Sequence, residues 1–148
     1  MKVAIIGVGA YSVALASMLC KKKNDIIMWT ESKERYDKYN IDGCIKDVIP
    51  GVSLPSYVKL SLDKKETVMN AQVVIIASVA SFVGEICKDI KDYIQKDTII
   101  CIASKGIEDK SCRFLSDIAY DILNVKNIAI LSGPSFAIDM VNNNPIGL

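Results

Sequence analysis

Two glycines near the N-terminus have the spacing of a phosphate-binding turn. Gly7 and Gly9 follow an apolar stretch directly and precede a run of small and apolar residues with helical character. In the G-x-G-x-x-G pattern the first glycine permits a tight turn, the second admits a pyrophosphate close to the backbone, and the third lets the helix pack against the strand. Ser12 occupies the third position. The pattern predicts a dinucleotide site in which the helix and the strand lie slightly farther apart than with glycine.

An acidic side chain stands where this pattern places the contact with the adenosine ribose. Glu31 lies 22 residues after Gly9 and follows a second apolar run, which ends at Trp29. A carboxylate at this point accepts hydrogen bonds from the ribose hydroxyls and repels a 2′-phosphate. This interpretation predicts NAD(H) in preference to NADP(H). The alternative is that Glu31 is a surface residue at the start of a helix, where negative charge is favourable in any case.

Two further groups of polar residues follow later apolar runs. Lys105 comes just after the run 98–103, so its ammonium group is free either to reach into a cleft or to remain in solvent. Residues 132–137 follow the last apolar run and contain a glycine and two serines. Backbone N–H groups and hydroxyls in such a turn can bind an anionic or polyol ligand. The alternative is a plain strand-to-helix turn in which Ser132 or Ser135 caps the helix.

Apolar runs alternate with helix-like stretches along the whole chain. Strands are expected at 1–6, 25–29, 57–62, 71–77, 98–103 and 127–131, and helices at 13–19, 32–39, 63–70, 81–93 and 111–123. This alternation is typical of an α/β fold, here a single domain with a Rossmann-type, mostly parallel sheet and helices on both faces. Ligands of such sheets bind outside the carboxyl ends of the strands. The polar residues described above are therefore expected at one edge of the sheet.

The individual elements carry more specific expectations. Ser32 and Asp63 are expected to cap the helices that follow them, and the breakers between residues 40 and 57 predict an irregular segment. The expected helices 81–93 and 111–123 have apolar residues at helical spacing. These residues are Phe82, Val83, Ile86, Ile90 and Tyr93 in the first helix, and Phe114, Leu115, Ile118, Ala119 and Ile122 in the second.

The composition excludes several classes of protein. The chain of 148 residues has the size of one domain, and its 18 lysines and arginines against 17 acidic residues leave no basic excess for nucleic acid. It has no histidine, and its five cysteines form no C-x-x-C pair, so neither a metal site nor a Ser-His or Cys-His nucleophile is expected. No apolar run reaches about 18 residues, so no membrane span is expected. Without a signal peptide, we expect a cytoplasmic protein with reduced thiols.

Four segments in this order and spacing resemble the N-terminal domain of bacterial NAD(P)-dependent glycerol-3-phosphate dehydrogenase. They are residues 7–16, the strand that ends at Trp29, and the segments 105–108 and 132–137. That family interconverts dihydroxyacetone phosphate and sn-glycerol 3-phosphate, a precursor of phospholipids. The resemblance implies that residues 1–148 are the NAD(P)-binding domain and that a C-terminal helical substrate domain, with the general-base lysine, is absent. It further implies that the chain binds cofactor without turnover, and that the full-length protein is a homodimer.

The resemblance also assigns roles to individual residues. Cofactor contacts fall on Gly7, Gly9, Ala10, Tyr11, Ser12, Glu31, Lys105 and Ala137. Substrate contacts fall on Lys105, Gly133 and Ser135. Ala10 and Tyr11 would lie against the pyrophosphate, and Ala137 near the nicotinamide. A cation such as Lys105 at the substrate oxygen would stabilise developing alkoxide charge.

Three positions depart from the family pattern, and two alternative functions remain open. Ser12 stands in place of a glycine, residues 78–81 in place of a common Pro-Ser pair, and Asp139 in place of a glutamate. The first alternative is a related dehydrogenase of sugar acids or keto acids, which would share this domain but lack the segments 105–108 and 132–137. The second is a free-standing dinucleotide-binding or sensor module.

Overall fold

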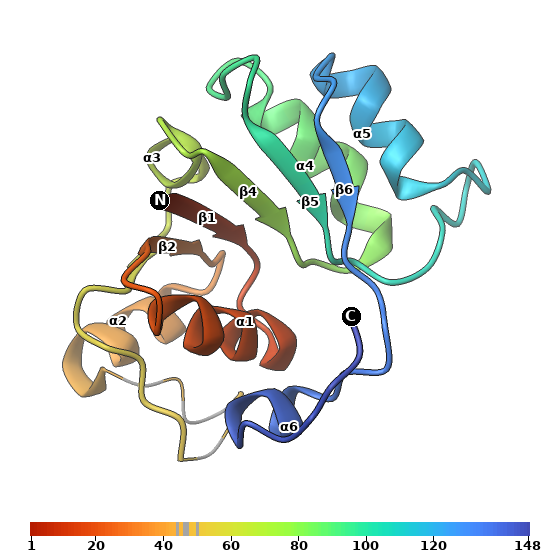
Figure 1. Ribbon diagram of the computed structural model, residues 1–148. Coiled ribbons are helices and arrows are strands. Elements are labelled where there is room, and N and C mark those ends of the chain that lie inside the picture. The colour runs from red at the N-terminus through yellow and green to blue at the C-terminus, as the bar shows by residue number, and fades with distance from the viewer. Residues whose placement is uncertain (44, 46–47, 50) are drawn as a thin grey trace.

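Runs of valine and isoleucine form one parallel sheet. The computed structural model describes residues 1–43, 45, 48–49 and 51–148. Within this part of the chain the strands are β1 (Lys2–Ile6), β2 (Asp25–Trp29), β3 (Lys59–Ser61), β4 (Val73–Ile76), β5 (Ile99–Ile102) and β6 (Ile128–Ile130). They lie in the order β3-β2-β1-β4-β5-β6, and every neighbouring pair is parallel (Figure 1). This is the doubly wound order of a Rossmann-type fold, which confirms the predicted class.

Helices cover both faces of the sheet. One face carries α1 (Ala10–Cys20), α2 (Lys33–Asp42) and α6 (Ala137–Val141), and the other carries α3 (Lys64–Val68), α4 (Val83–Ile90) and α5 (Leu115–Leu123) (Figure 1). Side chains of β1 alternate between the two layers, since Val3 and Ile5 belong to the first core cluster and Ala4 and Ile6 to the second. A strand covered on both faces must be apolar throughout, which explains the continuous apolar run.

The first helix begins three residues earlier than expected, directly at the glycine turn. Gly9 is its N-cap, and the N–H group of Val13 donates to the Gly9 carbonyl at 3.0 Å. No side chain caps this end of α1, and its first turn holds no acidic residue. The first N–H groups of the helix therefore stay available at the carboxyl end of β1.

The predicted helix caps at Ser32 and Asp63 are confirmed. The Ser32 hydroxyl accepts a hydrogen bond from the Arg35 N–H at 3.2 Å, and the Asp63 carboxylate accepts one from the Lys65 N–H at 2.8 Å. The described residues between α2 and β3 form turns and bends, in agreement with the expected irregular segment. Within that segment Cys44 and Pro50 lie outside the described residues.

The expected helix 81–93 is shorter than its apolar pattern indicates. A 3₁₀ turn, η1 (Ala80–Phe82), precedes α4, which ends at Ile90. Val83, Ile86 and Ile90 are buried, but Phe82 and Tyr93 lie outside α4 and are 55% and 40% exposed. Their expected place in the helix is wrong, because Phe82 belongs to the 3₁₀ turn before α4 and Tyr93 lies beyond the end of α4.

The expected helix 111–123 begins only at Leu115. The Glu108 carboxylate accepts a hydrogen bond from the Ser111 N–H at 2.7 Å, which folds the preceding residues into a turn. Hydrogen bonds from Ser111 also lower the pKa of Glu108 below its ordinary value. Phe114 is 67% exposed and pairs with Ile107 in an isolated antiparallel bridge. Its expected place within the helix is therefore wrong, since Phe114 is the N-cap of α5.

The described cysteines are unpaired thiols, and two of them have a raised pKa. These cysteines are Cys20, Cys87, Cys101 and Cys112. Burial raises the pKa of Cys87 to about 12 and also raises the pKa of Cys101. A protonated thiol is a poor nucleophile. Cys87 is part of one core cluster, and the half-buried Cys101 packs against the other. Among the helices of the described residues, none combines the length and the apolar character that a bilayer crossing requires.

Candidate functional site

A cleft of about 970 Å³ lies at the carboxyl ends of the strands. It opens where the strand order reverses between β1 and β4, which is the usual ligand site of an open parallel sheet. Five residues predicted from the sequence line it, namely Gly7, Gly9, Tyr11, Glu31 and Lys105. Ala10, Ser12, Gly133, Ser135 and Ala137 do not line it. The topology thus brings half of the predicted residues to one cleft.

The two glycines of the turn differ in what surrounds them. Gly7 has φ +112°, and a Cβ at this position would lie 2.6 Å from the carbonyl oxygen of Ala77. Gly9 has φ −111°, and a Cβ there would meet no atom within 4 Å. The protein's own backbone therefore requires glycine at position 7. At position 9 the lack of a side chain instead leaves open space beside the cleft.

Ser12 is accommodated by a hydrogen bond at the third position of the glycine pattern. Its side chain is 1% exposed, and its hydroxyl donates to the Ala77 carbonyl at 3.4 Å. Ala77 directly follows β4, so this contact joins the start of α1 to the end of the central strand. Ala10, two residues earlier on the same helix, is exposed.

The end of the cleft beside β2 carries charges of both signs. Glu31 is exposed there, and Arg35 and Lys64 line the same cleft. One Arg35 nitrogen, Nη1, donates to the carbonyl of Val8 at 3.0 Å. Sequence reasoning missed both cations. Arg35 could have been found from its i, i+4 spacing to Glu31, but Lys64 reaches the cleft only through the parallel pairing of β2 with β3.

At the other end, three segments that are distant in the sequence meet around Tyr11. The Lys105 ammonium nitrogen lies 5.7 Å from the centre of the Tyr11 ring, within the range of a cation–π contact. The Tyr11 hydroxyl shares a hydrogen bond of 3.2 Å with the Ser135 hydroxyl. Ser135 is 6% exposed and thus lies one hydrogen bond behind the cleft wall.

The segment 132–137 leads into α6 without a side-chain cap. The N-cap of α6 is Phe136, and no side chain accepts a hydrogen bond there. The alternative in which Ser132 or Ser135 caps the helix is therefore wrong, since the Ser135 hydroxyl contacts Tyr11. Gly133 packs against residue 147, whose carbonyl oxygen would lie 2.4 Å from a Cβ at Gly133. Ala137 packs against the core cluster that contains α1.

Residues 78–81 and their neighbours form an apolar rim over the cleft. The Ser78 N–H donates to the Ser104 hydroxyl at 3.2 Å, which joins the loops that follow β4 and β5. Val79, Phe82 and Ile107 line the cleft while 66%, 55% and 44% exposed. Exposed apolar side chains around a cleft with few polar groups suit the flat faces of a base or a nicotinamide ring. Sequence reasoning missed this rim because it assigned Phe82 to the expected helix 81–93.

Residues 2–148 match the family described as the NAD-dependent glycerol-3-phosphate dehydrogenase N-terminus. The chain belongs to this family. The predicted resemblance is thereby confirmed, and the match favours glycerol-3-phosphate dehydrogenases over the sugar-acid and keto-acid dehydrogenases considered as an alternative. The family also supports NAD(P) as the class of cofactor.

Individual relatives from this glycerol-3-phosphate dehydrogenase family share its name, and one of them shares the fold of this chain. Glycerol-3-phosphate dehydrogenase [NAD(P)+] of Leptospira biflexa is 36% identical over 98% of this chain and 44% of the relative. The enzyme of the same name from Blochmanniella pennsylvanica is 32% identical over 99% of this chain and 43% of the relative. The crystal structure of glycerol-3-phosphate dehydrogenase from Coxiella burnetii superposes with a TM-score of 0.91 at 26% identity, over 97% of this chain and 44% of that one. The chain thus spans less than half the length of these relatives.

Proposed function

We propose that this chain binds NAD(H) across the cleft as the dinucleotide-binding domain, residues 1–148, of a two-domain glycerol-3-phosphate dehydrogenase. The observation that carries the proposal is the glycine turn at the switch point of the sheet, where Gly9 leaves open space in front of the start of α1. A helix N-terminus with unused N–H groups attracts a pyrophosphate. Gly7, Gly9, Ala10, Tyr11 and Ser12 would hold this part of the cofactor, Gly7 and Ser12 by shaping the turn.

The adenosine ribose would lie beside Glu31, at the β2 end of the cleft. A carboxylate there accepts hydrogen bonds from both ribose hydroxyls and opposes the negative charge of a 2′-phosphate. Support comes from the position of Glu31 on the cleft wall, two residues after the end of β2. The preference for NAD(H) over NADP(H) follows from this placement.

This preference predicts a difference in affinity that a single charge controls. We expect the chain to bind NADH at least about tenfold more tightly than NADPH, and Glu31→Gln to narrow that ratio severalfold by removing the repulsion. Glu34→Gln is a matched control, because Glu34 is exposed on α2 and ion-paired with Lys38 outside the cleft. Fluorescence titration of both dinucleotides gives the ratios. A preference of the unmodified chain for NADPH would contradict the assignment of Glu31.

The substrate would enter at the Tyr11 end of the cleft. When bound, the nicotinamide supplies hydride transfer to and from carbon. Lys105 would stabilise negative charge on the substrate oxygen and would contact the cofactor, and its exposed position on the cleft wall supports this role. Gly133, Ser135 and Ala137 would complete this end, and Ser135 is already linked to it through Tyr11.

Dihydroxyacetone phosphate and sn-glycerol 3-phosphate are the proposed substrates, and nucleic acid is not a proposed partner, since the net charge is only +1. Unpaired thiols among the described cysteines support a cytoplasmic location. The homodimer proposed for the longer protein rests on the family resemblance.

Calorimetry of the 148-residue chain with NADH tests the central proposal. We expect saturable binding of one NADH per chain, and no oxidation of NADH when dihydroxyacetone phosphate is added, because relatives are more than twice as long. Circular dichroism establishes that the chain is folded in the same buffer. A folded chain that does not bind NADH would overturn the proposed function, and turnover by the chain alone would overturn the placement of the base in another domain.

A further inference from the structure

A second, shallower hollow of about 540 Å³ lies beside the β2 end of the cleft. Among the residues that the structure describes, Trp29 and Lys64 line both the hollow and the cleft. These two side chains therefore form the wall between the two spaces, and we call them the Trp29–Lys64 wall. No role for Lys64 follows from the glycine pattern or from the strand ends.

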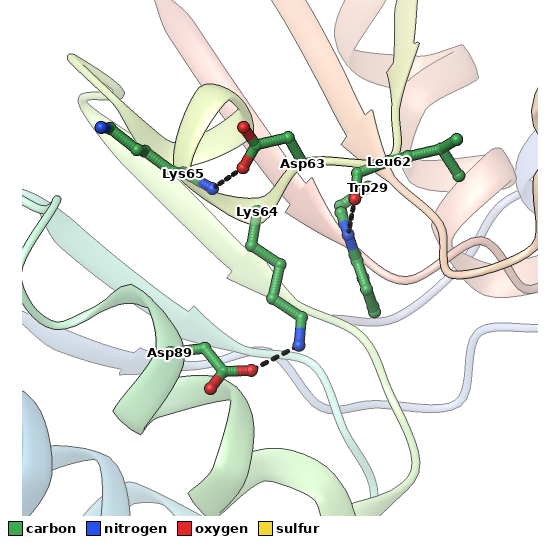
Figure 2. Close-up of polar contacts among 6 residues, drawn as sticks. All are labelled: Trp29, Leu62, Asp63, Lys64, Lys65 and Asp89. Atoms are coloured by element: carbon green, nitrogen blue, oxygen red, sulfur yellow. Dashed lines mark hydrogen bonds and ion pairs between the residues drawn. The ribbon is translucent and has the colours of Figure 1, made fainter.

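Three contacts hold the wall, one between its two members and one from each of them to another residue (Figure 2). The indole N–H of Trp29 donates to the Leu62 carbonyl at 3.1 Å, which fixes the ring. The Lys64 ammonium lies 4.5 Å from the centre of the Trp29 ring and forms an ion pair with the Asp89 carboxylate of α4. The Lys64 side chain is only 24% exposed. Its long stem thus lies largely covered between the cleft and the second hollow.

The charge of Lys64 is engaged within the wall. An ammonium group that already faces an aromatic ring and a carboxylate gains less from a third, anionic partner than an unpaired one does. The surface offered to the cleft at this point is thus a tryptophan ring and a lysine stem, with the positive charge directed to Asp89. Such a surface suits a flat, uncharged base more than a phosphate group.

From this arrangement we propose that Lys64 is a positioning residue for the adenine end of the cofactor. Asp89 makes this end of the cleft selective against a 2′-phosphate. The stem of Lys64 keeps the Trp29–Lys64 wall closed, so the base has a surface to pack against. Asp89 holds the ammonium away from the ribose. The inference rests on the proposed binding of NAD(H), and it adds a contact for specificity beside Glu31.

The neighbouring lysine provides a matched control within the same helix. Lys65 points away from Lys64 in Figure 2, and its ammonium lies 5.2 Å from the centre of the Tyr93 ring. Lys65 lines the second hollow and is not part of the cleft wall. The two residues thus share a helix, a charge and an aromatic neighbour, and differ in whether they reach the cleft.

Binding of 5′-AMP and NADH to Lys64→Ala and Lys65→Ala tests the positioning role. We expect Lys64→Ala to weaken both ligands by the same factor, about fivefold, since the effect is confined to the adenosine half that they share. Lys65→Ala should leave both affinities unchanged. Equal losses in the two variants, or unchanged 5′-AMP affinity in Lys64→Ala, would overturn the inference. If the unmodified chain fails to bind NADH, the proposed function itself fails, which is a different result.

The selectivity is tested by releasing the ammonium instead of removing the side chain. Asp89→Asn should raise the affinity for 2′,5′-ADP relative to 5′-AMP by about threefold or more, because Lys64 gains freedom to meet the additional phosphate. The double variant Asp89→Asn with Lys64→Met should lose this gain while keeping an apolar stem in the wall. Thermal unfolding of each variant establishes that it is folded. A ratio that stays the same or falls in Asp89→Asn would overturn the role of Asp89.

Discussion

Replacing Gly7 by alanine is expected to destabilise the domain by about 3 kcal/mol and to abolish NADH binding. Two costs act together. An alanine disfavours the φ of +112° at this position, and its Cβ would lie 2.6 Å from the Ala77 carbonyl oxygen. The Ala77 carbonyl is a backbone group directly after β4, so it cannot rotate away as a side chain could. Equilibrium denaturation in urea measures the loss.

Replacing Gly9 by alanine is expected to lower NADH affinity while leaving the stability of the fold nearly unchanged. Gly9→Ala should change the free energy of unfolding by less than about 0.5 kcal/mol, since φ is −111° and no atom lies within 4 Å of the new Cβ. NADH affinity should nevertheless fall by about tenfold or more, because the methyl group enters the space proposed for the pyrophosphate. A Gly9→Ala variant that binds NADH normally would contradict the proposed position of the cofactor.

The second large effect is expected at Lys105. In a full-length protein that carries this domain, Lys105→Ala should lower kcat for dihydroxyacetone phosphate by about 10²- to 10³-fold, because the variant lacks the cation proposed to stabilise alkoxide charge. The free energy of unfolding should change by less than about 0.5 kcal/mol. The side chain is exposed, and its contact with the Tyr11 ring at 5.7 Å is long. Steady-state kinetics and urea denaturation of the same variant measure both quantities.

Lys110→Ala is the appropriate control for this experiment. Lys110 is an exposed lysine of the same connection between β5 and α5, and it does not line the cleft. Its replacement should leave kcat unchanged. If both variants lose activity to the same extent, the effect arises from the loop as a whole, and the electrostatic role of Lys105 is refuted.

Elements whose formation depends on neighbouring residues in the chain were predictable. The strands and the caps at Ser32 and Asp63 follow from short apolar runs and from side chains that bond to N–H groups two or three residues away. The errors at Phe82, Tyr93 and Phe114 have one cause. Apolar residues at helical spacing were assigned to helices, but the chain enters turns at these points and leaves the side chains exposed.

The sequence by itself determined the turn at Gly7 and Gly9, the order of strands and helices, and the edge of the sheet at which polar residues gather. Those features depend on local geometry and on the restricted connections of parallel strands. Only the tertiary structure decided which side chains meet. The contact of Tyr11 with Ser135 joins positions 124 residues apart, and the Trp29–Lys64 wall arises because β2 pairs with β3. Such contacts depend on packing between separate elements, for which a single sequence carries no periodic pattern.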